Sequence, residues 1–176
     1  MALGRRIIPI RGARFTGEVS RFGVHWEWRI SAPMNYREML FTPKGFLMVG
    51  GVVLLALGLI GFVFLKGSPA ESALGSFFWL DNAENYAHLA LGIVALAAVY
   101  VPGLNTALAP YYRWIVILVG LIALFFGVYG FIASGPAPTN TFGLTNLELG
   151  DNLLHLVVAG WAFAAAFWSP SRAMGR

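Results

Sequence analysis

Four long apolar runs, separated by short polar segments, dominate the pattern of hydrophobic and polar positions along the chain. Phe46–Leu65 and Trp114–Ala133 are each 20 residues without a charge, which is enough helix to cross the hydrocarbon core of a bilayer. Tyr86–Val101 and Leu153–Trp168 are 16 residues each, and reach across only if the polar turn before each run joins the helix. Because a backbone in lipid must satisfy its own hydrogen bonds, these runs predict an all-α membrane protein with four transmembrane helices.

The composition agrees with that fold class. Only 11% of the 176 residues are charged and 58% are hydrophobic, whereas a soluble domain carries about a quarter charged residues. The chain has no cysteine, which excludes a disulfide framework and a thiolate metal site. No nucleophile–base pair, phosphate-binding loop or zinc motif is present in the sequence, so we expect a protein that is not an enzyme.

The positive charges are unevenly distributed. Of the 12 lysine and arginine residues, all except Lys66 lie before the first run, between the second and third runs, or near the end of the chain. Because cytoplasmic loops carry the excess of Lys and Arg, we expect both termini on the cytoplasmic side of a bacterial inner membrane. The predicted segments are a basic cytoplasmic N-terminal arm (1–45), a first hairpin (46–101), a cytoplasmic loop (102–113), a second hairpin (114–168) and a cytoplasmic tail (169–176).

An internal repeat is the most informative pattern in the sequence. Three glycines of the first run recur in the third run 69 residues later, and they are Gly51, Gly58 and Gly61, then Gly120, Gly127 and Gly130. An acid-x-x-acid-Asn-x-x-His-Leu motif recurs with a shift of 67 residues, and its polar members are Asp81, Glu84, Asn85 and His88, then Glu148, Asp151, Asn152 and His155. The repeat predicts two tandem helical hairpins, with the glycines at contacts between helices.

The motif allows several interpretations. Its acids lie at a helix N-terminus, where the helix dipole favours negative charge. Polar residues in a span need a partner, so His88 and His155 could accept hydrogen bonds from a loop or from the neighbouring repeat. Two imidazoles at matching depth could instead bind haem, chlorophyll or a metal, or belong to a proton or ion path. A di-metal carboxylate site is not expected, because the first and third runs supply no carboxylate.

The N-terminal arm carries a different pattern. Apolar residues at Val24, Trp26, Trp28 and Ile30 alternate with polar ones, which indicates a β-strand. An isolated strand is not stable in water, and no other run offers an obvious mate. The strand therefore pairs with Ile7–Ile10, adds to the sheet of a partner protein, or lies on anionic lipid headgroups. A short interfacial helix is expected around Asn35–Phe41.

The duplicated hairpin, with its second helices entered by acid-Asn-x-x-His-Leu, resembles an uncharacterised family of small bacterial four-helix membrane proteins. The resemblance covers about residues 44–170. It implies the four-helix fold and no particular activity.

Three functional hypotheses follow. The first is a non-catalytic integral membrane subunit that scaffolds or stabilises a larger complex, such as a photosynthetic or respiratory complex. Residues 1–45 and the helix faces would then contact other subunits and membrane lipids, and no nucleic acid. The second is a membrane protein that binds a tetrapyrrole (haem or chlorophyll) or a metal through His88 and His155. The third is a small transporter or channel, although the spans lack the charges and proline breaks that transporter sites use.

Overall fold

The computed structural model describes residues 6–10, 13–20, 23–30, 36–133, 139–141 and 145–168. The chain divides into two compact units, residues 1–35 and residues 36–176, and each is described by itself. The second unit therefore begins ahead of the predicted boundary between residues 45 and 46.

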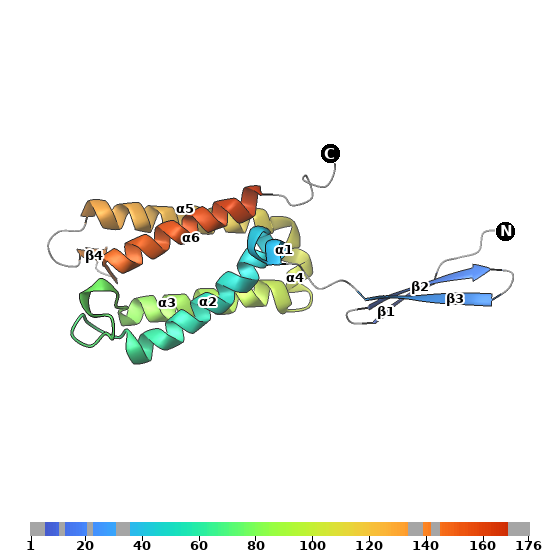
Figure 1. Cartoon of the computed structure of the whole chain (residues 1–176), viewed down its shortest axis with the longest axis horizontal. Helices are drawn as coiled ribbons and strands as arrows, with labels where there is room; N and C mark the ends of the chain where they lie inside the picture. Colours follow the sequence, from blue (N-terminus) through green and yellow to red (C-terminus); the bar gives the residue numbers. More distant parts are fainter. Residues whose placement is uncertain are drawn as a thin grey trace. The chain divides into compact units, whose positions relative to one another are not determined.

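Within the described residues, four helices are long and apolar enough to cross a membrane (Figure 1). They are α2 (Pro43–Phe64), α3 (Asn82–Tyr100), α5 (Tyr112–Ala133) and α6 (Leu149–Phe167). The prediction of four helices long and apolar enough to cross a membrane is thus confirmed. Both shorter runs gain their missing length at the N-terminal side, since α3 begins at Asn82 and α6 at Leu149.

Local capping explains two of these starting points. At α2 the Thr42 hydroxyl accepts the Gly45 N–H (3.1 Å), and Pro43 occupies a position where its missing N–H costs nothing. At α3 the capping is reciprocal. The Glu84 N–H donates to Asp81 Oδ1 (2.9 Å), and the Asp81 N–H donates to Glu84 Oε2 (2.8 Å). This capping box satisfies two N–H groups that have no partner inside the helix.

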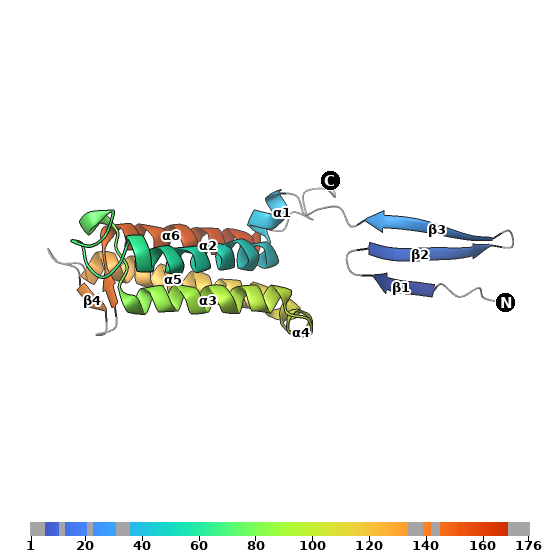
Figure 2. The ribbon, with the colours of Figure 1, turned by 90° about the horizontal axis from the view of Figure 1, so that it is seen from below.

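The four helices form two antiparallel pairs, α2 with α3 and α5 with α6, and α2 also contacts both helices of the second pair (Figure 2). An apolar core fills one end of the bundle, where α2 and α5 begin and α3 and α6 end. We call this the core end, and its buried residues are Phe46, Leu47, Ala98, Val99, Tyr112, Val116, Ala162, Ala165 and Ala166. The Tyr112 hydroxyl donates to the Ala98 carbonyl (2.7 Å), which joins α5 to α3 across the two pairs.

A short helix, α1 (Tyr36–Phe41), lies at the core end and contacts α2 and α6. The indole N–H of Trp161 donates to the Leu40 carbonyl (2.6 Å), and the rings of Phe41 and Trp168 stack with their centroids 5.6 Å apart. The helix predicted around residues 35–41 is therefore present from residue 36, while residue 35 lies outside the described residues.

Short elements occupy the connections. At the core end, α4 (Leu104–Leu108) and the 3₁₀ turn η2 (Ala109–Tyr111) join α3 to α5. At the opposite end, η1 (Gly75–Phe77) lies between α2 and α3. The strands β4 (Thr139–Thr141) and β5 (Thr145–Leu147) pair antiparallel before α6.

The N-terminal unit contains an antiparallel sheet in the order β1-β2-β3, made of β1 (Arg6–Ile10), β2 (Ala13–Ser20) and β3 (Gly23–Ile30). The predicted strand is confirmed as β3. The predicted pairing with Ile7–Ile10 is wrong, because β3 pairs with β2 and β1 pairs with the other edge of β2. Short hairpin connections favour pairing between consecutive strands, and β2 follows β1 after only two residues.

Candidate functional site

Seven polar residues of the repeated motif lie at the end of the bundle opposite the core end, which we call the motif end. We name this set the motif cluster, and it consists of Glu84, Asn85, His88, Glu148, Asp151, Asn152 and His155. All except the two histidines are buried. The electrostatic interactions of His88 are with Asp151 and His155, so the cluster extends from α3 to α6.

Two asparagines of the motif cluster fill the space beside glycines of the neighbouring helix. The Asn85 amide on α3 lies against Gly61 on α2, and the Asn152 amide on α6 lies against Gly130 on α5. A methyl group at either glycine would overlap the amide. Asn85 is 0% exposed, and its Nδ2 donates to the Leu80 carbonyl (3.5 Å). The asparagines therefore fit only where the facing helix has no side chain.

The other glycines of the repeat also lie at helix–helix contacts. A methyl group at Gly58 would lie 2.8 Å from Leu89 Cγ, and one at Gly127 would lie 2.9 Å from Leu156 Cγ. Farther along, Gly51 faces two side chains of α3, and Gly120 faces two side chains of α6. These facing residues are Ala95 and Leu96 in the first hairpin, and Ala162 and Phe163 in the second. The contacts of the three repeated glycines of the first hairpin thus each have a counterpart in the second.

The acids of the two hairpins differ in their bonds. In the first hairpin Asp81 and Glu84 form the capping box of α3. In the second hairpin Glu148 occupies the N-cap position of α6, but its side chain makes no capping bond. Its Oε1 instead accepts the backbone N–H of Trp79 (3.1 Å), which belongs to the segment before α3. The carboxyl group of Glu148 therefore bonds across the two hairpins.

Asp151 and His155 form a second polar pair in α6, one helical turn apart. The distance from His155 Nδ1 to Asp151 Oδ2 is 2.9 Å, and to the Asp151 carbonyl oxygen it is 3.1 Å. Asp151 is 1% exposed. The ring of His155 packs against Phe126 of α5, with the ring centroids 5.6 Å apart. The position of this imidazole is thus set by its own helix and by α5.

Burial raises the pKa of Glu148 to about 8, although the hydrogen bond from the Trp79 N–H acts in the opposite direction. The nearby carboxylates of Asp151 and Asp81 raise it further. At neutral pH the carboxyl group of Glu148 is therefore mostly protonated and uncharged.

Several buried atoms of the motif cluster have no hydrogen-bond partner among the described residues, and they include Asn85 Oδ1, His88 Nδ1, Glu148 Oε2 and Asn152 Oδ1. No group of three or more His, Cys, Asp or Glu side chains in the described part of the chain is placed to hold a metal ion. The motif cluster is thus rich in acceptor oxygens and has few donors.

Two residues at this site were not singled out by the sequence. Trp79 is buried and supplies the N–H that Glu148 accepts, whereas the sequence indicates only an aromatic residue near a helix end. A methyl group at Gly150 would lie 2.5 Å from the Phe77 carbonyl oxygen, so a glycine is needed for α6 to approach this segment. Its counterpart in the first hairpin is Ala83, and the repeat therefore gives no signal for it.

The four residues expected to bind a partner lie at alternate positions of β3, and they are Val24, Trp26, Trp28 and Ile30. The register pairs Trp28 with Phe15 and Val24 with Val19, both on β2. Directly paired positions share a face of an antiparallel sheet, so these apolar positions of β2 and β3 belong to one face.

Taken as a class, the second unit is a multi-pass helical bundle with apolar spans and a buried polar cluster at one end. No family model, curated protein or solved structure matches the chain.

Proposed function

We propose that this chain is a non-catalytic integral membrane subunit that scaffolds or stabilises a larger membrane complex. One observation carries the proposal: the polar residues of the motif hold helices in place. Asp81 and Glu84 cap α3, Asn85 fits against Gly61, and Glu148 bonds to the segment before α3. Large apolar side chains remain exposed on all four long helices, which gives both lipids and partner helices a surface to contact.

The proposal includes two tandem hairpins that arose by duplication, as in the bacterial family that the sequence resembles. The matched glycine contacts support it. Gly58 faces Leu89 and Gly127 faces Leu156, at the shifts that the sequence repeat requires. In two hairpins of unrelated origin, the two helices of each hairpin would have no reason to contact each other through equivalent residues.

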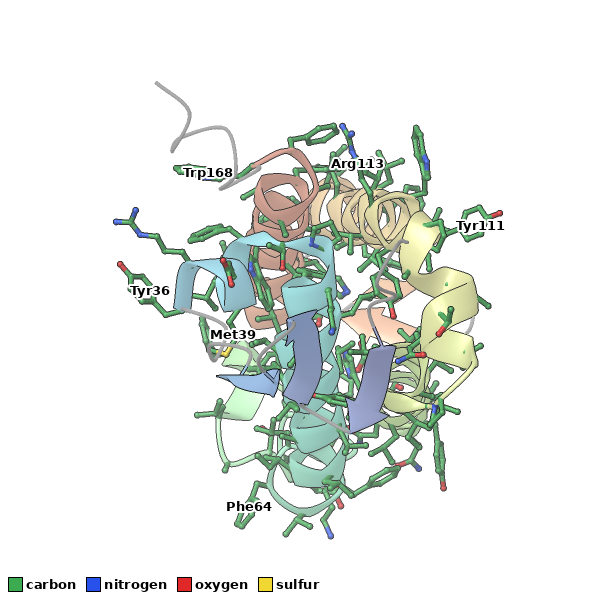
Figure 3. All side chains as sticks on the ribbon, turned by 90° about the vertical axis from the view of Figure 1, so that its right-hand side faces the viewer. Tyr36, Met39, Phe64, Tyr111, Arg113 and Trp168 are labelled. Carbon is green, nitrogen blue, oxygen red and sulfur yellow. The ribbon has the colours of Figure 1, made fainter. Side chains whose placement is uncertain are left out.

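We further propose that both termini face the cytoplasm of a bacterium and that the motif end faces outward. The charges support this orientation, because Arg37, Lys44 and Arg113 lie at the core end and the acids of the motif cluster lie at the other. Exposed aromatic residues, among them Tyr36, Tyr111 and Trp168, point away from the bundle at the core end (Figure 3). Such side chains are typical of a membrane–water interface.

Cysteine labelling tests the orientation cleanly, because the chain has no cysteine of its own. Ser76→Cys lies at the motif end and Thr106→Cys at the core end, and both positions are exposed. A membrane-impermeant maleimide should label Ser76→Cys in intact cells and Thr106→Cys only after permeabilisation. The opposite labelling pattern would overturn the orientation.

Co-purification tests the subunit function. The full-length protein, tagged and produced at its native level, should leave the membrane in mild detergent with other subunits in fixed stoichiometry. Trp26→Ala combined with Trp28→Ala should weaken that association, because β3 offers apolar positions to a partner. Phe77→Ala, at an exposed position of the motif end, serves as the matched control. Recovery of the wild-type chain as the sole polypeptide would contradict the proposal.

A tetrapyrrole-binding protein is the second candidate function. It is favoured by His88, which interacts electrostatically with His155 of the other hairpin. Visible absorption of protein purified from its native membrane tests it. A bound haem or chlorophyll should disappear in His88→Ala and His155→Ala and persist in His25→Ala, which changes the remaining histidine. A colourless wild-type protein would exclude this candidate.

A further inference from the structure

The two hairpins carry their motif acids in reversed order, and this reversal changes what the acids can reach. The first hairpin has Asp81 at the N-cap and Glu84 three residues later, so a short side chain caps the helix and a longer one reaches back. The second has Glu148 at the N-cap and Asp151 three residues later. Here no reciprocal bonds form, and the longer carboxylate extends away from its own helix.

Glu148 extends to the other hairpin and is buried there. Its Oε1 accepts the Trp79 N–H (3.1 Å), its side chain is 6% exposed, and its Oε2 has no partner among the described residues. Gly150 permits this contact, because a larger residue would collide with the backbone at Phe77. The carboxyl group of Glu148 is therefore enclosed between the first turn of α6 and the segment before α3.

The ionisable neighbours of Glu148 are mainly acidic. Asp81 at the start of α3 and Asp151 on α6 interact with it, and His155 on α6 is the basic group that does so. His88 on α3 interacts with Asp151 and His155. The cation nearest in sequence to this segment is Lys66, which is exposed and pairs with Leu80 through its backbone.

A charged Glu148 would be costly in these surroundings. It would place a third carboxylate near Asp81 and Asp151, with the backbone N–H groups of Trp79 and of Glu148 itself in place of its hydration shell. A neutral carboxyl group avoids both costs. Hydrating the charged form would require the segment before α3 to move away from α6.

We propose that Glu148 is a proton-binding group at the interface of the two hairpins, and that its protonated form holds the first turn of α6 against the Phe77–Trp79 segment. The proton is the ligand, and its release loosens the motif end. Burial, which raises the pKa of Glu148 to about 8, places this release in the mildly alkaline range.

The backbone N–H of Trp79 reports directly on the carboxyl group that it donates to. The full chain, labelled with ¹⁵N-tryptophan and reconstituted in lipid nanodiscs, is titrated from acid to alkaline pH, and Trp79→Phe assigns the resonance. We expect a shift with a midpoint near 8. Glu148→Gln should abolish the shift, and Glu71→Gln, at an exposed position of the motif end, should leave it unchanged.

Two results of this titration would overturn the proposal. One is a wild-type midpoint close to the ordinary value of 4.5, and this measurement does not depend on any variant being folded. The other is a titration that persists in folded Glu148→Gln. An infrared carbonyl band of a protonated carboxylic acid in the wild-type protein at neutral pH gives a second readout, and its absence would count equally against the proposal.

The loosening of the motif end is measured separately. Spin labels at Ser76→Cys and Leu153→Cys, both at exposed positions, report the distance between the segment before α3 and α6. The distance distribution should broaden above the midpoint in the wild-type background and stay narrow in Glu148→Gln. A distribution that does not change with pH in the wild-type background would refute the coupling of the two hairpins.

Discussion

The contact between Gly61 and Asn85 should be among the least tolerant positions in the bundle. In Gly61→Ala the new methyl group would occupy the place of the Asn85 amide, and a fully buried side chain would have to move. Overpacking of this kind costs about 1–3 kcal/mol, and a displaced buried amide costs about 1–3 kcal/mol more. The better helix propensity of alanine offsets about 1 kcal/mol. We therefore expect a net loss of about 1–5 kcal/mol.

Reversible unfolding of the full chain in mixed detergent micelles, followed by circular dichroism, measures this loss. Gly160→Ala is the matched control, because nothing lies within 4 Å of a methyl group there. Gly130→Ala should cost about as much as Gly61→Ala, since Gly130 faces Asn152 in the same way. Equal free energies of unfolding for Gly61→Ala and Gly160→Ala would refute the reasoning.

Three further predictions concern other contacts. Burial raises the pKa of Glu148 from 4.5 to about 8, so the unfolded state loses this proton at a lower pH than the folded state does. The free energy of unfolding should therefore fall as the pH rises from 4.5 to about 8. The free energy of unfolding should change by at most about 1.4 kcal/mol per pH unit, and a value that does not depend on pH in this range would contradict the prediction. Tyr112→Phe removes a buried hydrogen bond and should cost about 1 kcal/mol in the same unfolding assay, whereas the exposed Tyr111→Phe should cost nothing measurable. Trp161→Phe removes the bond to the α1 carbonyl and should speed hydrogen exchange in α1, and Trp114→Phe should not.

The helices were predictable because an uncharged run of sufficient length has few alternatives to a membrane-spanning helix. The residues at which the helices begin were harder to predict. Hydrophobicity alone starts the second helix at Tyr86, whereas the capping box starts α3 at Asn82. The bilayer-crossing length requires the polar turn before Tyr86 to join the helix, but only the capping acids indicate the residue at which the helix begins.

The N-terminal sheet was predicted only in part. β3 has clear alternation of large apolar residues, whereas β2 alternates Ala13, Phe15 and Val19 with Arg14 and Glu18 and carries less apolar area. A strand pattern of that kind is weak by itself. Its assignment comes from pairing with β1 and β3 on both edges, and pairing depends on the arrangement of three segments at once.

The order of the motif acids shows why a repeat in sequence does not fix equal roles. When Asp and Glu are both treated as acids, Asp81 and Glu148 are equivalent, and so are Glu84 and Asp151. Their side chains nevertheless differ by one methylene group, and this difference separates their roles. Asp at the N-cap with Glu three residues later closes the capping box. The reverse order does not close it, and both carboxylates remain available for other bonds. The second hairpin uses them for Trp79 and His155. Glu148→Asp combined with Asp151→Glu should therefore build a capping box on α6. It should also abolish the alkaline titration seen at the Trp79 N–H. A double variant that kept this titration would show that side-chain length does not cause the difference between the two hairpins.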